Sequence, residues 1–554
     1  MEFANLVTSC DDFVLKMTHL RQELQDAELV QFENQCGDIA MVFIKLHNDI
    51  EAAVNFLKVI RNSPTGPKRV VKSSFFEDVF LICHQSQNED LQQIFLDLLT
   101  KVKIGLIGQS KVELLINPFT KWVSSSNVLT AEYASKVMNQ LCMEYPDIAI
   151  PAIVGYIHNV NHESTLTLRY AAIIGKLLNP VSTTANNTTV LSGANTTTIR
   201  LPVGSEEDAT YHNSLFDACL RHGAIEFMLS LNVKSTDLLV QLVGIELLSQ
   251  FGGLSAGLEY VISNDVLAWL MSQALSTMDG SDNMLASACL LEIGNLIFTS
   301  LAARTSSVLV EHMANNTQQM QDLINCINYV LDNEAGKDEG ERTSALSTLT
   351  AVCSLSVHSL HLVLCHQTLV ETWYSLINKG PDSQAALIHS ITTVLLYHKH
   401  VRANGANSNI ASASSGVLVH GEHDMFKLVD MIGKARSGAT TTMPFIIKLA
   451  SQPIDNLHIA ASRLFEALCL QDDGWGVNYC FSSYEFFSYL NNRALEHGKE
   501  QMDAKYSVIL ALSKNIRYRM LNPDHVKVLD LYLEKGAYYA AHQAELAEPA
   551  TMER

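Results

Sequence analysis

The sequence predicts an all-α protein in which paired helices stack into a curved, repetitive array. Hydrophobic residues make up 47% of the 554 residues, and the 12 prolines and 27 glycines are too few for a disordered or fibrous chain. The chain is also longer than the roughly 250 to 300 residues at which a single core stops growing. Apolar residues recur with helical spacing along most of it, whereas strand-like alternation is confined to residues 198–203.

The first part of the chain contains three segments whose apolar residues have helical spacing. These segments lie at 49–60, 90–102 and 130–144. Two prolines and a glycine at 64–67 interrupt the chain after the first segment. We therefore expect helical repeats to begin near the N-terminus.

Later segments share one pattern, a capping residue followed by a broad apolar face. In the clearest of them Asp455 is the expected N-cap, and eight apolar residues between 457 and 468 lie on one face. The other starts are Ser164, Thr236, Ser281, Thr343, Ser383 and Asp503.

Most of these starts lie about 40 to 50 residues apart once two polar inserts, 181–210 and 402–421, are set aside. The interval of 62 residues from 281 to 343 is the exception. Units of this length with two or three helices are typical of a HEAT/armadillo-like α-solenoid. A set of separate helical domains is the alternative.

This pattern divides the chain into five regions. The predicted regions are N-terminal helical repeats at 1–162, central helical repeats at 163–400 with a disordered insert at 181–210, a flexible insert at 401–424, C-terminal helical repeats at 425–540 and a tail at 541–554. Small polar residues dominate both inserts, which is typical of mobile loops.

Charge and cysteine content narrow the possible partners and compartments. The net charge of −20 disfavours nucleic acid as a partner, because an acidic protein repels the phosphate backbone. The eleven cysteines are an odd number and include no Cys-x-x-Cys pair, so the sequence indicates neither a disulfide framework nor a zinc ribbon. The residues after Met1 lack the features of a secretory signal, and the uncharged stretch 343–370 is too rich in Ser, Thr and His for a membrane span. We expect a cytoplasmic protein, a monomer when free. The basic residues Lys68, Arg69 and Lys72 are a weak candidate for nuclear import, with a solvated loop as the alternative.

One motif suggests catalysis. Gly253-Leu-Ser255-Ala-Gly257 matches the pattern of a nucleophile elbow, in which the serine lies on a tight turn between a strand and a helix. Here the run 237–251 before it has helical spacing, and Gly252-Gly253 resembles a helix C-cap. The sequence therefore favours a turn over a nucleophile, and we expect no enzyme.

Two groups of residues suggest metal binding. The first consists of His358, His361, Cys365 and His366, and the second of His420, Glu422, His423 and Asp424. Core or loop residues are the favoured interpretation of both, because neither has an evident complete ligand set on a rigid element. The pair Gly105 and Gly108 lacks the remaining residues of a nucleotide-binding loop, so we expect no cofactor.

The last hundred residues resemble a known family. The resemblance lies in blocks of similar order and spacing: Ser451-Gln-Pro453, Leu457-His458, Ala460-Ala461, Glu496-His-x-Lys499, Asp503-Ala-Lys-Tyr506 and Tyr532-Leu-Glu-Lys-Gly-Ala-Tyr-Tyr539. These blocks are similar to those of the proteasome non-ATPase regulatory subunit 5 family. The resemblance implies a HEAT-like assembly chaperone that binds the C-terminal domain of an ATPase subunit of the regulatory particle base and leaves before the mature proteasome forms.

Five residues within these blocks are candidates for partner binding: Glu496, Lys499, Asp503, Lys505 and Tyr506. Spacings of three and four, from 496 to 499 and from 499 to 503, could give a charged helix face that also includes Lys505, and Tyr506 could anchor an interface. Capping of the terminal repeat is the favoured alternative. For the whole chain, the alternatives to a chaperone are a helical-repeat adaptor that binds linear peptides and an esterase-like enzyme using Ser255.

Overall fold

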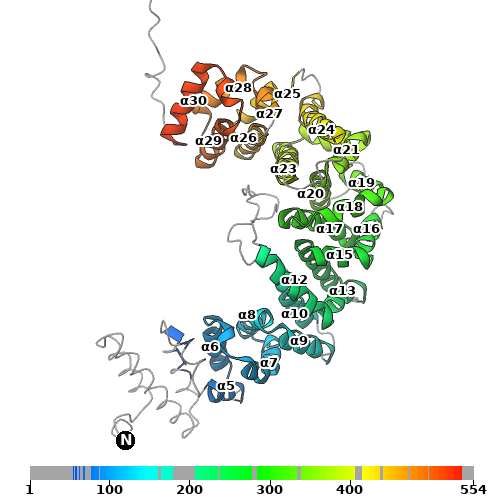
Figure 1. Ribbon diagram of the computed structural model, residues 1–554, viewed down its shortest axis with the longest axis vertical. Helices are drawn as coiled ribbons and strands as arrows, with labels where there is room; N and C mark the ends of the chain where they lie inside the picture. Colours follow the sequence, from blue (N-terminus) through cyan, green and yellow to red (C-terminus); the bar gives the residue numbers. More distant parts are fainter. Residues whose placement is uncertain are drawn as a thin grey trace, which may run out of the picture. The chain divides into compact units, whose positions relative to one another are not determined.

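The computed structural model describes most of the chain and contains helices and turns only. The described residues are 76–85, 88–159, 164–178, 206–234, 237–276, 284–332, 339–405, 415–436, 441–471, 474–496 and 498–538, with isolated positions between 54 and 71. No strand occurs within these ranges. The chain divides into two compact units, one formed by residues 1–184 and 204–250 and the other by 185–203 and 251–554 (Figure 1).

The first unit is a stack of short and medium helices. Its helices are α5 (Phe76–Gln85), α6 (Glu89–Thr100), the 3-10 helix η1 (Ile104–Leu106), α7 (Gln109–Val123), α8 (Val128–Glu144), α9 (Pro146–Asn159), α10 (Ser164–Leu178), α12 (Glu206–Arg221), α13 (Ala224–Lys234) and α14 (Leu238–Glu246). Helix α8 packs against α6, α7, α9 and α10, and α10 packs in turn against α12 and α14. The expected helices near 90–102 and 130–144 are therefore confirmed as α6 and α8.

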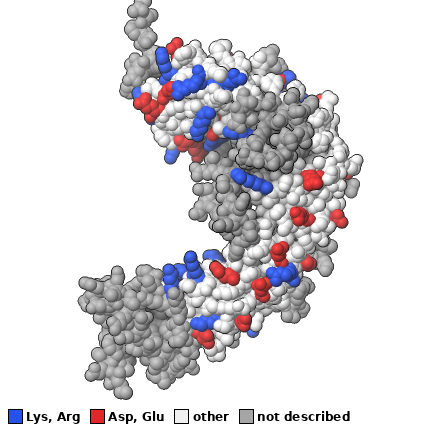
Figure 2. Space-filling view, viewed as in Figure 1, with Lys and Arg blue, Asp and Glu red and all other residues white. Residues whose placement is uncertain are grey.

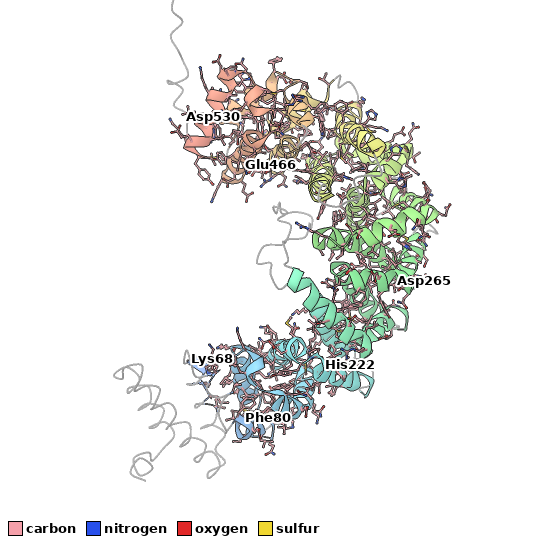
Figure 3. The ribbon with its side chains drawn as sticks, in the orientation of Figure 1. Lys68, Phe80, His222, Asp265, Glu466 and Asp530 are labelled. Atoms are coloured by element: carbon pink, nitrogen blue, oxygen red, sulfur yellow. The ribbon has the colours of Figure 1, made fainter. Side chains whose placement is uncertain are left out.

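An aromatic cluster fills the core between α5, α6 and α7. Phe80, labelled in Figure 3, lies 6.2 Å from Phe95 and from Phe119 and 6.1 Å from Trp122 between ring centroids. Its edge-to-face contacts with Phe119 and Trp122 are geometries that aromatic pairs prefer. Three consecutive helices are thereby joined through one apolar core.

The second unit consists of successive repeats, each with one long helix. The 3-10 helix η2 (Leu247–Gly253) spans the boundary between the two units at residue 250. The helices of the second unit are α15 (Ser255–Ser263), α16 (Val266–Leu275), α17 (Met284–Ala303), α18 (Ser307–Asn315), α19 (Thr317–Leu331), α20 (Glu339–Leu355), α21 (Val357–Cys365), α22 (Gln367–Ser375), η5 (Leu376–Asn378), α23 (Pro381–Gly405), α24 (Ser415–Lys434), α25 (Thr442–Ala450), α26 (Asp455–Cys469), α27 (Trp475–Cys480), α28 (Glu485–Asn491), η7 (Arg493–Leu495), α29 (Lys499–Lys514), η8 (Tyr518–Met520) and α30 (Pro523–Lys535).

The long helices α17, α20, α23, α26 and α29 form a ladder in which each packs against the next (Figure 1). The shorter helices between them pack against a short helix of the next repeat: α19 packs against α22, and α21 packs against α24. All eight apolar residues predicted to share one face of the helix at 457–468 are buried in α26. The predicted all-α, HEAT/armadillo-like architecture is therefore confirmed within this unit.

Several predicted boundaries are wrong by a few residues. Asp455 is the first residue of α26, and its N-cap is Ile454, so the expected cap is displaced by one position. Helix α29 begins at Lys499, four residues before the predicted start. The interval of 62 residues shortens because α17 begins at Met284 and α20 at Glu339.

The predicted inserts are also shorter than expected. Helix α12 begins at Glu206, inside the insert placed at 181–210, and the rest of that insert lies outside the described residues. Helices α23 and α24 extend to Gly405 and back to Ser415, so most of the insert placed at 401–424 is helical. Small residues such as Ala and Ser are compatible with helix once neighbouring helices supply packing.

Helix α17 is long and apolar enough to cross a membrane by length and composition alone. However, 56% of its apolar window is buried within the protein, and it packs between α16 and α20. The buried Glu292 lies on the same helix. These contacts are typical of the core helix of a repeat and account for the apolar composition of α17.

Packing of α23 against α26 generates a prediction about pH. His389 on α23 has a pKa lowered from 6.5 to about 4, mainly because burial disfavours its charged form and also because Arg463 on α26 repels it. The unfolded chain therefore binds more protons than the folded chain between these values, so stability falls as pH drops through this window. At pH 5 we expect His389 to cost about 2 kcal/mol relative to pH 7.5.

The measurement compares the unfolding midpoints of the wild-type protein and His389→Gln in denaturant at pH 7.5 and pH 5. The variant removes the titrating group, so its loss of stability on acidification should be smaller by that amount. Equal losses in the two proteins would contradict the prediction.

Candidate functional site

The C-terminal repeats bring the residues of the sequence blocks into one connected network. Helices α28 and η7 lead into α29, and Asn492 caps η7 by accepting a hydrogen bond from Ala494 N at 3.1 Å. Helix α29 packs against both α26 and α30. The network therefore lies where α26, α29 and α30 meet.

A buried ion pair lies at the centre of this network. Lys505 Nζ donates to Glu496 Oε1 at 2.6 Å, and neither side chain is exposed to solvent. Lys505 Nζ also donates to the carbonyl of Asn492 at 2.7 Å and lies 4.6 Å from the centroid of the Tyr489 ring. A buried ammonium needs such partners because it has lost its water.

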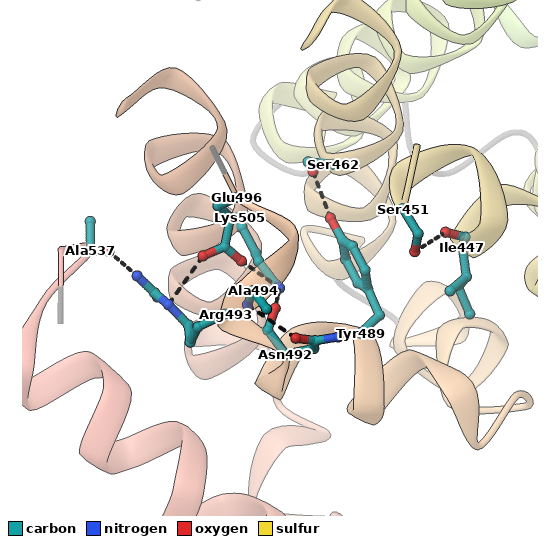
Figure 4. Close-up of polar contacts among 10 residues, drawn as sticks. All are labelled: Ile447, Ser451, Ser462, Tyr489, Asn492, Arg493, Ala494, Glu496, Lys505 and Ala537. Atoms are coloured by element: carbon teal, nitrogen blue, oxygen red, sulfur yellow. Dashed lines mark hydrogen bonds and ion pairs between the residues drawn. The ribbon is translucent and has the colours of Figure 1, made fainter. Parts of the chain in front are cut away.

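Arg493 extends the ion pair to the segment after the last helix, where Figure 4 shows its hydrogen bond to Ala537. Its Nε lies 3.1 Å from Glu496 Oε2, and its terminal nitrogen donates to the carbonyl of Ala537 at 2.6 Å. Its guanidinium carbon lies 4.3 Å from the centroid of the Tyr532 ring. One carboxylate therefore holds two cations, one on α29 and one that reaches α30.

Tyr489 connects the same network to α26. Its hydroxyl lies 2.8 Å from Ser462 Oγ, and its ring lies 5.5 Å from that of Phe465 (Figure 4). Burial raises the pKa of the Tyr489 hydroxyl. The phenol therefore stays neutral at physiological pH and can serve as both donor and acceptor.

Burial also controls the charge of Lys505. It lowers the pKa of the amine from 10.5 to about 8, although Glu496 opposes this change. The amine is therefore still mostly protonated at pH 7 and able to pair with the carboxylate. The cost of burying this charge is offset by the carboxylate, the carbonyl and the ring.

The five candidate binding residues divide into internal and surface positions. Glu496 precedes α29 and is buried with Lys505, so the expected single charged face of one helix does not form. Lys499 is exposed, whereas Asp503 and Tyr506 are partly exposed. A partner can therefore contact these three directly, and their role in binding stays a prediction.

The surface residues are themselves positioned by neighbours. Asp503 Oδ1 accepts a hydrogen bond from the hydroxyl of Tyr538 at 2.7 Å. Tyr506 stacks against Tyr532, with ring centroids 6.0 Å apart. Helix α30 thus fixes the orientation of the exposed side of α29.

Helix α30 has the composition of a terminal element. Among its residues only Leu529 and Tyr532 are buried, while Asp524, Lys527 and Glu534 are exposed. A polar outer face is what a terminal repeat needs where stacking ends. This favours the capping alternative for α30.

Sequence reasoning missed three exposed apolar residues in the same repeats. Tyr484, Ile516 and Met520 are 85%, 70% and 69% exposed. Ile516 and Met520 flank Arg517 and Arg519 between α29 and α30. The available signal was that Ile516 interrupts the basic run 514–519 and Met520 follows it directly, where a solvated basic segment would be expected.

Basic and acidic side chains are interspersed in the C-terminal repeats. Residues 436–538 contain equal numbers of basic and acidic side chains, eleven of each, although the whole chain has a net charge of −20. On the face drawn in Figure 2, Lys and Arg lie beside Asp and Glu over the C-terminal helices. The acidic excess of the chain therefore lies mainly before residue 436.

The motif around Ser255 does not form a nucleophile elbow. Ser255 is the first residue of α15 and follows the 3-10 helix η2 rather than a strand. Gly252 and Gly253 belong to η2, so the expected C-cap is also wrong. A Cβ on Gly257 would lie 2.5 Å from the carbonyl oxygen of Phe251, so this glycine permits close packing of two helices. Gly105 lies in η1, and Gly108 is the N-cap of α7 with φ 81°, a left-handed conformation that favours glycine.

Within the described part of the chain, no group of three or more His, Cys, Asp or Glu residues could hold a metal ion, and this includes the described members of the two candidate groups. His366 instead caps α22, since its Nδ1 accepts a hydrogen bond from Leu369 N at 3.3 Å. His358 and His423 are exposed. The side chains of His420 and Glu422, and the positions Arg69 and Lys72 of the basic cluster, lie outside the described residues. His361, Cys365 and Asp424 do come together.

The buried ion pair generates a prediction about stability. Replacement of Lys505 by Met keeps most of the side-chain volume but leaves Glu496 with Arg493 as its remaining cation. Loss of one partner of a buried pair costs about 3 kcal/mol. We expect this loss in the unfolding midpoint of Lys505→Met, measured in denaturant at pH 7.

The matched control is Lys499→Met, the same substitution at an exposed position of the same helix, which should change stability by less than about 0.5 kcal/mol. Lys505→Met combined with Glu496→Leu removes both charges and should recover part of the loss. Equal effects of the two single substitutions would show that the pair is not a stabilising element.

Comparison with solved structures finds other helical-repeat proteins at low identity. Importin β matches with 10% identity and a TM-score of 0.49, covering 96% of this chain and 65% of importin β. A designed armadillo repeat protein matches with 10% identity and a TM-score of 0.31, covering 52% of this chain and 99% of the designed one.

Sequence comparison gives a more specific result for the C-terminal repeats. The model of the proteasome non-ATPase 26S subunit family matches residues 436–553. The 26S proteasome non-ATPase regulatory subunit 5 of Homo sapiens is 39% identical over 93 residues, which are 16% of this chain and 18% of the relative. That of Mus musculus is 34% identical over 101 residues, covering 18% of this chain and 19% of the relative. The matches thus span less than a fifth of the length of these relatives, and the similarity to the proteasome non-ATPase 26S subunit family lies in the C-terminal region of this chain, residues 436–553.

Proposed function

We propose that this chain is a non-catalytic assembly chaperone of the proteasome regulatory particle base. In this proposal it binds the C-terminal domain of an ATPase subunit and dissociates before the mature proteasome forms. The observation that carries the proposal is the match of residues 436–553 to the proteasome family, at the helices where the buried Glu496–Lys505 network lies.

The repeat architecture supports a binding role. Stacked helices present a broad surface, which suits a folded partner better than a small ligand. The exposed residues Lys499, Tyr484 and Ile516 offer a charge and two large apolar side chains on the C-terminal repeats. Aromatic and apolar residues of this kind commonly supply most of the binding energy at an interface.

The charge distribution supports a modest electrostatic contribution at the C-terminal repeats. Since residues 436–538 are balanced in charge, attraction there depends on complementary pairs, whereas the acidic remainder of the chain acts at longer range. Long-range attraction is screened within about 8 Å at physiological salt. Binding should therefore weaken with salt without being lost, because apolar contacts are insensitive to screening.

The experiment is co-purification of the tagged full-length chain with proteasomal ATPase subunits at low and high salt. We expect folded ATPase subunits in the bound fraction under both conditions, with less at high salt. The mature proteasome should be absent from that fraction, since the proposed chaperone leaves before it forms. Absence of ATPase subunits at low salt would refute the proposal.

A charge reversal locates the interface. Lys499→Glu should lower recovery of the ATPase subunit about fivefold, equivalent to about 1 kcal/mol, because it places a repulsive charge in the predicted contact. The matched control is Lys136→Glu on α8, where Lys136 is 52% exposed in the first unit. Equal losses for the two variants would show that the effect is not local to the C-terminal repeats.

Two rival functions give different outcomes in the same experiments. A helical-repeat adaptor would recover disordered peptides with basic clusters in place of folded ATPase subunits. An esterase would lose an activity when Ser255 is changed to Ala. The helical position of Ser255 disfavours this reading, so we expect Ser255→Ala to leave both stability and ATPase recovery unchanged.

A further inference from the structure

Two helices of the second unit bring a cysteine, a histidine and a carboxylate into a row. Cys365 Sγ lies 3.5 Å from His361 Nε2, one turn away on α21. His361 Nδ1 lies 3.0 Å from Asp424 Oδ2 on α24. The two ring nitrogens of His361 therefore face a nucleophile on one side and a carboxylate on the other, which is the order found in cysteine-based nucleophilic sites.

Accessibility sets this cysteine apart within the described part of the chain. Cys365 is exposed, whereas the other eight cysteines described there are buried. Burial raises the pKa of several of those thiols, including Cys83, Cys219 and Cys289, which disfavours their reactive thiolate form. A reagent in solution can therefore reach Cys365 and finds the others enclosed.

The carboxylate is placed to orient the ring of the histidine. Asp424 is nearly enclosed, with 6% of its side chain exposed, while the His361 side chain is 50% exposed. An enclosed carboxylate stabilises an adjacent cation strongly because little water screens it. Asp424 thus orients the ring with Nε2 toward the sulfur and stabilises the imidazolium formed when the thiol gives up its proton.

The packed elements present several charged or titratable groups around the thiol. His358 lies on the same helix, His366 begins α22, and Lys427 lies on α24 with Asp424. Cys365 is the last residue of α21, where the carbonyl ends of the helix disfavour a thiolate. Lys427 Nζ donates to one of these carbonyls, that of Leu364, at 3.3 Å, and brings a positive charge to this end.

We propose that Cys365 is a reactive thiol that exchanges with small disulfides, with His361 as its base and Asp424 as a positioning residue. The thiol proton moves to His361 Nε2, and the thiolate attacks one sulfur of the disulfide. An S–S bond forms to Cys365 while the S–S bond of the reagent breaks, and the departing thiolate takes the proton from His361. The reagent supplies both the oxidising equivalent and the leaving group, so atoms and electrons balance.

The experiment measures this exchange on the full-length chain with oxidised glutathione as the probe. Cys10 and Cys36 lie outside the described residues, so both are changed to Ser in every protein tested. Mass spectrometry gives the rate of addition at pH 7 and identifies the modified peptide. We expect addition at Cys365 first and its loss in Cys365→Ser.

Substitutions of the neighbours separate chemistry from folding. His361→Gln should slow the exchange about tenfold or more, because it removes the base that takes the proton of the thiol. His358→Gln removes an exposed histidine from the same helix and should leave the rate unchanged. Asp424→Asn removes the carboxylate that orients the ring of His361, so it should slow the exchange and change the pH dependence of its rate.

Three results would overturn the proposal. One is faster addition at another cysteine of the same protein. Another is a rate for His361→Gln equal to that for His358→Gln. The third is a wild-type advantage over His361→Gln that persists when both proteins are unfolded in denaturant, because the three residues are adjacent only in the folded state.

Discussion

The C-terminal repeats depend on the buried pair between Glu496 and Lys505. Each charged group has lost its hydrating water on burial, so each needs hydrogen-bonding or ionic partners within the protein. The carbonyl of Asn492, the ring of Tyr489 and the guanidinium of Arg493 supply them, and these come from α28 or η7. Through Arg493 the same carboxylate also holds the segment after α30. One interaction therefore determines how three consecutive helical elements meet.

Earlier repeats of the second unit are held by close approach of their long helices. A Cβ on Gly294 of α17 would lie 3.0 Å from the Cα of Thr348 on α20, so only glycine permits this spacing without adjustment. Thr348 Oγ1 donates to the carbonyl of Leu290 at 2.7 Å, which satisfies a buried hydroxyl across the same contact. Small residues and internally bonded hydroxyls thus replace large apolar side chains where the ladder is tightest.

Periodicity predicted the long helices because their apolar faces are wide and continuous, as in α26. It did not predict α7 and α9, whose interior prolines, Pro118 and Pro151, are normally read as breaks. It also misplaced Glu496 and Lys505, because a spacing of nine residues across a helix boundary has no signature on a helical wheel. The contact between His361 and Asp424 joins positions 63 residues apart and depends on how α21 packs against α24.

The resemblance to the proteasome family carries more information about the fold of the last repeats than about their surface. Of the residues in its blocks, Lys505, Glu496, Tyr532 and Ala537 take part in the internal network, and His458 is buried. Residues enclosed in this way preserve the shape of a repeat whatever it binds. In the proposed binding role, contacts with a partner would come from exposed positions such as Lys499 and Tyr484, which lie outside the buried network. The proposed binding role therefore depends on surface residues, whereas the buried pair contributes to the stability of the fold.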